Sequence, residues 1–232
     1  MNTRQWTKMG LLVTGMLTAQ LACAGVISLN FELPSLPSGG GNGYEQILNY
    51  YNGGADQYGD VGPNLGVVFN STALALGQYP VAPNSNTGNE PGGGNALIFL
   101  SANDAILNYA AGFTTGFSFY YDAPAGYTGT INVYSGVNDT GTLLASLSLP
   151  GNGISPTEPW FSMWTALGVT FAGTAESIDF GGTANEIAFA DVTFGSGTPA
   201  ATPDSTDASL YVISGLFLAG AAWRFRKQTA AA

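Results

Sequence analysis

The chain has 232 residues, of which 45% are hydrophobic and 9% are charged, and its formal net charge is −10. It has no histidine and one cysteine, which excludes histidine-based catalysis, histidine metal sites, disulfide frameworks and cysteine clusters for zinc or iron–sulfur centres. The negative charge argues against nucleic acid as a partner, and the length allows one ordinary domain with additional segments at its ends.

The N-terminal end has the pattern of a secretory signal peptide. A basic start is followed by an apolar run at 10–21, which is shorter than the roughly 20 residues that span a bilayer. Ala22 and Ala24 are the small residues of a cleavage site and flank Cys23. A lipoprotein signal acylated on Cys23 is the alternative, and Gln20, which stands where such signals usually have Leu, argues against it.

The body of the chain, from 25 to 195, has an all-β pattern. Short runs rich in Val, Ile, Phe, Tyr and Thr alternate with Gly, Asn, Pro and Asp clusters, and no long stretch has a helical period. The expected strands are 26–31, 96–100, 113–121, 130–134, 142–149, 169–171, 177–180 and 187–194. The residues from Asn138 to Gly141 predict a hairpin turn. We expect an antiparallel β-sandwich of jelly-roll type, with a barrel as the alternative.

The carboxylates of the body have no internal cation to pair with, because there is no Lys or Arg between Met9 and Trp223. They must be solvated, hydrogen-bonded, protonated or bound to an external cation. Glu32 follows the first expected strand and Asp191 lies in the last. In jelly-roll carbohydrate-binding modules these strands lie close together, and a Glu and an Asp in similar places can hold a structural Ca²⁺. The alternative is that both are exposed edge residues. Calcium is the one cofactor that the sequence suggests.

A second group of oxygen-bearing side chains runs from Asp56 to Asp60, with Asn52 and Asn64 nearby. Its spacing does not match an EF-hand loop, and a solvated turn is the favoured interpretation. The glycine clusters at 39–43 and 92–94 are not followed by Lys and do not open a helix, so they are interpreted as flexible turns rather than phosphate-binding loops.

Trp160 and Trp164 are the two tryptophans of the body. Aromatic rings stack on the apolar faces of sugars, so these two are candidate carbohydrate contacts. Burial in the core is the favoured interpretation, and one tryptophan in each role is a further alternative. For catalysis only paired carboxylates remain, and a glycosidase needs two at about 5–5.5 Å or 6.5–9.5 Å. No motif predicts that two of them meet. We therefore expect no enzymatic activity and no catalytic residues, and keep a carboxylate-dependent glycan hydrolase as a second alternative.

The C-terminal end combines three elements. Pro203, Asp204 and Ser205 precede an apolar segment at 208–223, and a basic cluster follows, made of Arg224, Arg226 and Lys227. The apolar segment is about 24 Å long as a helix, somewhat less than a hydrocarbon core of about 30 Å. Its apolar residues cover the helix all round, which favours a membrane segment over an amphipathic helix packed on the domain.

These elements, in this order, resemble the PEP-CTERM class of bacterial sorting signals. Pro203-Asp204-Ser205 is most similar to the VPDSG variant, with Thr202 and Thr206 as departures. The resemblance implies recognition and cleavage by a membrane transpeptidase of the exosortase type, in a Gram-negative bacterium that makes exopolysaccharide. It also implies export through the inner membrane, transient anchoring by the C-terminal helix, and a location at the cell surface or outside the cell. Passages of the body that are also similar to PEP-CTERM proteins are 50–54, 65–69, 112–119 and 187–194.

The expected organisation is a signal peptide (1–24), a β-sandwich domain (25–195), a linker with the sorting motif (196–207), a transmembrane helix (208–223) and a basic tail (224–232). The expected function is that of a secreted, non-catalytic protein of the cell surface or extracellular matrix. The main alternative is a carbohydrate-binding module with a structural calcium site. The expected partners are the exosortase-type transpeptidase, the membrane and extracellular polysaccharide, and nucleic acid is not among them.

Overall fold

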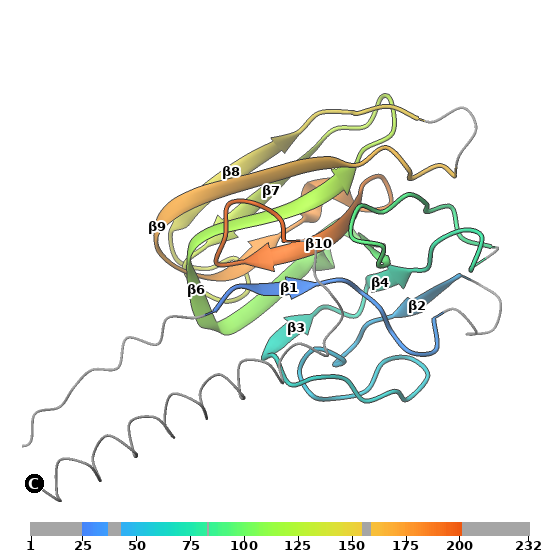
Figure 1. The fold of residues 1–232 in the computed structure, drawn as a ribbon. Helices are drawn as coiled ribbons and strands as arrows, with labels where there is room; N and C mark the ends of the chain where they lie inside the picture. Colours follow the sequence, from blue (N-terminus) through green and yellow to red (C-terminus); the bar gives the residue numbers. More distant parts are fainter. Residues whose placement is uncertain (1–24, 37–42, 83, 155–158, 201–232) are drawn as a thin grey trace, which may run out of the picture.

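The computed structural model describes residues 25–36, 43–82, 84–154 and 159–200 (Figure 1). Its strands are β1 Ile27–Leu29, β2 Tyr44–Gln46, β3 Val67–Phe69, β4 Ala73–Leu76, β5 Ala96–Phe99, β6 Ile106–Asp122, β7 Gly129–Tyr134, β8 Leu143–Leu149, β9 Thr165–Asp179 and β10 Ala188–Phe194. All pairs of these strands are antiparallel. The helical elements of these residues are two short 3₁₀ turns, η1 Ala102–Asp104 and η2 Gly181–Thr183. The prediction of an all-β antiparallel fold is confirmed.

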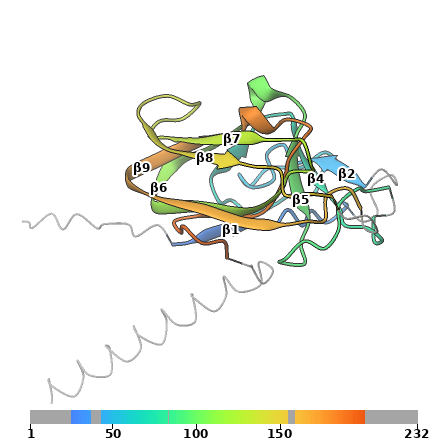
Figure 2. The same ribbon diagram turned by 90° about the horizontal axis from the view of Figure 1, so that it is seen from above.

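The two longest strands, β6 and β9, run through both layers of the sandwich. They pair along most of their length, but the register shifts on both sides of Phe113, where Gly112 and Thr115 have positive φ. Before this break β6 lies beside β3, and after it β6 lies beside β10. The strands thus form one layer in the order β3-β6-β9-β7-β8 and a second in the order β2-β4-β5-β10-β6-β9. In the view from above, β2, β4 and β5 gather at one end of the molecule (Figure 2).

The main core lies between these layers and is strongly aromatic. Four residues that the sequence places on one face of β6 are all buried in it, namely Phe113, Phe117, Phe119 and Tyr121. The ring of Phe189 lies 4.9 Å from that of Phe180 and 5.4 Å from that of Phe119. Each fully buried ring contributes about 1.5–3 kcal/mol through burial of apolar surface. This core therefore supplies much of the stabilisation of a domain without disulfides.

A smaller apolar cluster covers the opposite face of β4, β5 and β10. Because successive residues of a strand point to opposite faces, Ala73 and Ala75 join the main core while Leu74 and Leu76 join this outer cluster. Its other buried members are Ala96, Ile98, Phe161 and Ala188, and Trp164 packs against it. This part of the sheet is therefore covered on both faces, and the segment around Phe161 forms the outer cover.

Three features differ from the sequence-based expectations. The expected strands 169–171 and 177–180 are parts of one strand, β9, and β6 begins seven residues before 113. β9 is rich in Gly, Ala and Thr and is largely exposed in its first half, so its apolar pattern is interrupted although its pairing with β6 continues. The short strands β2, β3 and β4 were not expected, because three or four residues carry too little periodic pattern.

The residues after β10 continue along the domain. The hydroxyl of Ser28 donates to the carbonyl of Ala200 at 3.0 Å, and that of Ser118 donates to the carbonyl of Ser196 at 2.9 Å. The described residues include no helix long and apolar enough to cross a membrane. The expected signal peptide, the expected sorting motif, the apolar segment 208–223 and the basic cluster lie outside the described residues.

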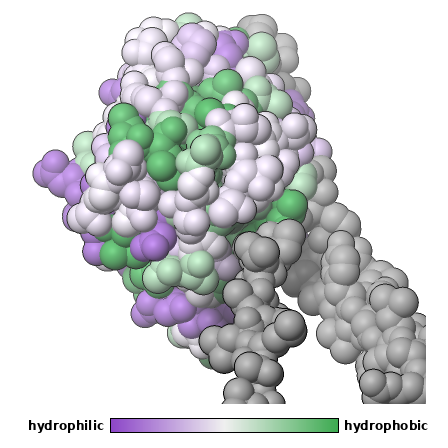
Figure 3. Space-filling view, turned by 90° about the vertical axis from the view of Figure 1, so that its left-hand side faces the viewer, coloured by the Kyte–Doolittle hydropathy of each residue, from purple (hydrophilic) through white to green (hydrophobic). Residues whose placement is uncertain are grey.

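One side of the molecule carries a patch of hydrophobic residues, which is green in Figure 3. Among the apolar side chains of the outer strands, Leu143 on β8 is 51% exposed. Leu144 on β8 and Phe171 on β9 are half-buried against the main core. Apolar surface of this kind is common on monomeric proteins and does not by itself indicate a site.

Candidate functional site

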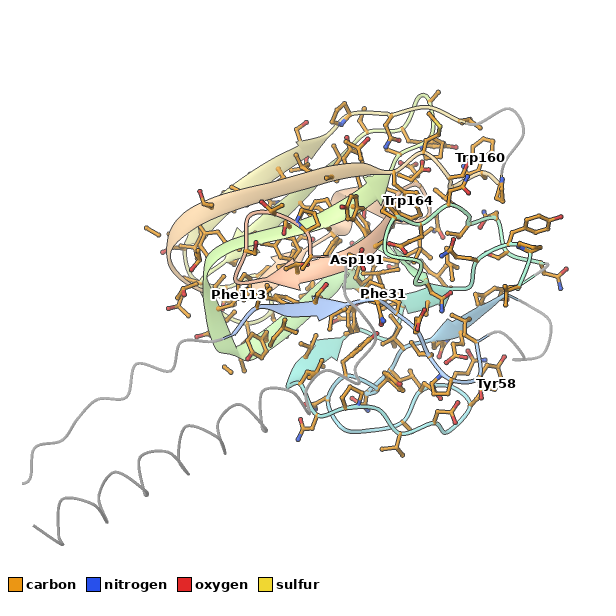
Figure 4. All side chains as sticks on the ribbon, in the orientation of Figure 1. Phe31, Tyr58, Phe113, Trp160, Trp164 and Asp191 are labelled. Carbon is orange, nitrogen blue, oxygen red and sulfur yellow. The ribbon has the colours of Figure 1, made fainter. Side chains whose placement is uncertain are left out.

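The two tryptophans of the body differ in their surroundings (Figure 4). Trp160 is 43% exposed. Trp164 is half-buried against the outer cluster, and its ring N–H donates to the carbonyl of Gly88 at 2.9 Å. The segment is fixed at Phe161, whose N–H donates to the carbonyl of Asn86 at 2.8 Å and whose carbonyl accepts from the N–H of Gly88 at 2.8 Å. Trp160 is thus available to a ligand, whereas Trp164 supports the segment.

A hollow of about 400 Å³ opens on the outer face of the sheet, beside this segment. It is lined by Tyr44, Leu74, Leu76, Asn86, Ile98, Leu100, Phe161 and Asn185. We call it the aromatic hollow. Its floor is the apolar face of β4 and β5. Tyr44 and Leu100, which also line it, are each 45% exposed. The side-chain amides of Asn86 and Asn185 are exposed in its lining. The Asn185 amide donates to the carbonyl of Leu100 at 2.7 Å, which fixes its orientation.

Sequence reasoning did not find the aromatic hollow. Tyr44, Asn86 and Asn185 belong to three segments that are far apart in the chain, and none of them stands in a motif. The only local signal was the neighbouring aromatic segment around Trp160. Small ligands are held in concave sites of roughly 300–1,000 Å³ with apolar walls and a few polar groups, and the aromatic hollow has these properties.

A second cavity, of about 560 Å³, lies between the end of β1 and the loops before β5. Its lining includes Glu32, Tyr50, Gln78 and Asn95 together with glycines of the cluster at 92–94. Leu33, Pro34, Val81 and Ala82 also line it, so its walls are a mixture of polar and apolar groups with a single aromatic side chain. This is where the structure places Glu32, which is exposed.

Asp191 is placed differently from Glu32. It is 1% exposed, lies at the register shift of β10 and has a φ of 46°. Its side chain contacts that of Glu90, which is itself 6% exposed. A Cβ atom at Gly92 would lie 2.4 Å from one carboxylate oxygen of Asp191, so a side chain at this position would displace that carboxylate. The sequence left open whether Glu32 and Asp191 hold a calcium ion or are exposed edge residues. Exposure is found for Glu32 but not for Asp191.

The glycine cluster at 92–94 holds Glu90. The N–H of Gly94 donates to one carboxylate oxygen of Glu90 at 2.7 Å. Burial raises the pKa of Glu90 against the opposing effect of these backbone donors. Burial, with Glu90 as neighbour, raises the pKa of Asp191 to about 7. The two carboxyl groups must therefore share a proton or bind a cation. The calcium hypothesis for Glu32 and Asp191 stays a prediction, to which the structure adds Glu90.

Two more carboxylates are buried. Asp56, expected in a solvated turn, is 4% exposed. Asp122, the last residue of β6, is fully buried, and one of its oxygens accepts from the N–H of Met163. Burial raises the pKa of Asp122 to about 6, against the lowering effect of its backbone donors. Asp122 thus ties the tryptophan segment to β6.

Among the described residues, no three Asp or Glu side chains are arranged so that they could hold a metal ion. Glu90 and Asp191 are in hydrogen-bond contact, which is closer than the roughly 5–5.5 Å or more that separates glycosidase carboxylates. Glu90 and Asp191 are therefore not placed for glycoside hydrolysis.

No protein-family model matches the chain, and no curated protein matches it. Among solved structures, a family 6 carbohydrate-binding module whose binding sub-sites were dissected has 19% identity and a TM-score of 0.36, over 54% of this chain and 82% of its own. The module CBM6cm-2 from Cellvibrio mixtus lichenase 5A, in complex with cellotriose, has 12% identity and a TM-score of 0.36, over 55% of this chain and 88% of its own. A β-1,3-glucan-binding CBM6 from Bacillus halodurans has 18% identity and a TM-score of 0.34, over 48% and 81%. We draw no functional conclusion from these likenesses.

Proposed function

We propose that the protein is a non-catalytic, exported glycan-binding protein. The observation that carries this proposal is the aromatic hollow, which combines an apolar floor with Tyr44, Phe161 and two exposed amides. A sugar ring presents an apolar C–H face and a rim of hydroxyl groups. Aromatic and aliphatic side chains suit the face, and amides suit the rim because each both donates and accepts hydrogen bonds.

The charge of the chain indicates the class of glycan. Every ionisable side chain of the described body that carries a full charge at neutral pH is an acid, since no Lys, Arg or His occurs between 9 and 223. A surface of this kind repels anionic polymers at low ionic strength. The ligand class proposed for the aromatic hollow is therefore a neutral polysaccharide.

The test is affinity electrophoresis of the full-length protein in gels that contain neutral or anionic soluble polysaccharides. The protein is kept in a non-ionic detergent without a sugar headgroup, because of the apolar segments at its ends. We expect retardation by at least one neutral glycan, and at least a tenfold loss of affinity in Tyr44→Ala and in Trp160→Ala. The matched control is Tyr127→Ala, which removes a 36% exposed tyrosine outside the aromatic hollow.

Equal retardation of all variants would refute the aromatic hollow as the site, and no retardation by any neutral glycan would refute the function. Release of reducing sugar from a retained glycan, abolished by a single Glu→Gln change, would support the glycan-hydrolase alternative instead. A loss of binding in Trp164→Ala is also expected, because this residue holds the segment that carries Trp160.

We further propose that the chain ends direct export and sorting. The support is the order of elements in the sequence: a signal peptide, the Pro203–Ser205 motif, an apolar segment and the Arg224–Lys227 cluster. Intact mass spectrometry of protein from its native cell surface should give termini near residue 25 and near the motif. Deletion of 224–227 should impair sorting, and recovery of a surface protein that still carries its C-terminal end would refute the proposal.

A further inference from the structure

The side chain of Glu45 is buried on the core side of β2 without a hydrogen-bond donor. Successive strand residues point to opposite faces, so Tyr44 faces outward at 45% exposure and Glu45 faces inward at 0%. Across the strand pair Glu45 lies opposite Ala75, a member of the main core. Among the described residues, no donor reaches either carboxylate oxygen of Glu45. A carboxylate left in this condition is costly, so a proton or an external cation must compensate its charge.

The loop that follows β2 brings two more carboxylates to this point. One oxygen of Asp56 accepts from the N–H groups of Tyr58, at 3.0 Å, and Asp60, at 2.9 Å, which fixes the side chain in a tight turn. The other oxygen of Asp56 and one oxygen of Asp60 are buried and accept no hydrogen bond within the described residues. The side chains of Glu45 and Asp56 lie within hydrogen-bond distance of each other, and Asp60 acts on Glu45 through its charge.

Two acceptors can be this close only if a proton or a cation lies between them. No basic side chain occurs between 9 and 223, so the cation cannot come from the body of the chain. Three donor-free carboxylate oxygens of Glu45 and Asp56 instead present hard ligands to an external ion. Hard oxygen ligands select calcium or magnesium.

We propose that Glu45 and Asp56 bind one calcium ion at the base of the loop between β2 and β3. Calcium takes six to eight oxygen ligands in flexible geometry, from carboxylates, backbone carbonyls and water. In this site two carboxylates bind the ion, and backbone carbonyls and water complete its coordination. This agrees with the absence of a group of three carboxylates that could hold a metal ion among the described residues. Asp60 adds negative charge beside the ion. An irregular loop suits calcium better than magnesium, which demands a near-ideal octahedron.

This site is separate from the position of Asp191. Glu45 is on β2 and Asp56 on the following loop, whereas Asp191 is on β10 and contacts Glu90. The ion would join the loop to the sheet, because Glu45 comes from the sheet and Asp56 from the loop. It does not depend on glycan binding, so its test needs no glycan.

The experiment measures thermal unfolding of the full-length protein in chelator and in saturating calcium. A calcium concentration about a hundred times the Kd should raise the Tm of the wild type by about 5–10 °C. Glu45→Gln and Asp56→Asn should each lose most of this shift. Asp56→Asn keeps an oxygen for the turn, so it tests the site even where Glu45→Gln fails to fold. Asp104→Asn, at an exposed carboxylate, is the matched control and should keep the full shift.

Terbium luminescence gives a direct measure of binding, since Tyr58 lies two residues from Asp56 and can sensitise a bound lanthanide. Calcium should displace terbium, and Glu45→Gln should weaken terbium binding at least tenfold. A calcium shift retained by Glu45→Gln but lost in Asp191→Asn would place the ion at the other carboxylate pair and overturn the proposal. The absence of any shift, or an equal shift with magnesium, would also overturn it.

Discussion

The buried carboxyl group of Asp122 predicts a specific pH dependence of stability. Its pKa is raised from 3.8 to about 6, chiefly by burial, and no charged neighbour contributes. The folded chain thus holds this proton at pH values where the unfolded chain has lost it. Stability from this group is complete below about pH 4 and falls as the pH rises to about 6. At 1.36 kcal/mol per pH unit, the loss at pH 7 is about 3 kcal/mol.

The variant Asp122→Asn removes the titration while its amide oxygen can still accept from the N–H of Met163. Urea unfolding in chelator, followed by tryptophan fluorescence at pH values from 4 to 7, gives the free energy of unfolding of both proteins. The free energy of the variant relative to the wild type should rise by about 2–3 kcal/mol from pH 4 to pH 7. Effects of the substitution that do not change with pH cancel in this difference, as do the contributions of the other titrating groups, which both proteins share. If the free energies of unfolding of the two proteins ran parallel from pH 4 to pH 7, the argument that Asp122 ionises in a buried position would be refuted.

Three further predictions rest on packing and hydrogen bonds. Phe189→Ala should lower the free energy of unfolding by about 3–5 kcal/mol, because the ring is fully buried 4.9 Å from that of Phe180, and a loss below about 1 kcal/mol would contradict this placement. Trp164→Phe should cost about 1 kcal/mol through loss of the bond to Gly88, measured by the same urea unfolding. Asn152→Ala should speed amide exchange where β6 ends and β9 begins, since its side chain bonds both segments, and unchanged exchange would count against that role.

The candidate sites were only partly predictable. An aromatic segment near Trp160 and a buried role for one of the two tryptophans follow from local composition. The neighbours of Asp191 do not, because Glu90 reaches it from a loop that has no sequence relation to β10. The contact of Asp56 with Glu45 does not follow either, because Glu45 belongs to a strand of three residues. Local patterns state which residues are apolar or acidic, but not which distant acidic residues will meet.

The sequence alone determined the all-β class, most of the strands that form the aromatic core, and an anionic body without internal cations, because strand alternation, turn residues and charge counts are local properties. The tertiary structure alone decided that β6 and β9 bend through both layers, that residues from six separate segments line the aromatic hollow, and which carboxylates lie side by side. The physical reason is that these arrangements depend on register and on the packing of distant strands. Both are chosen by the burial of the whole core rather than by any one segment.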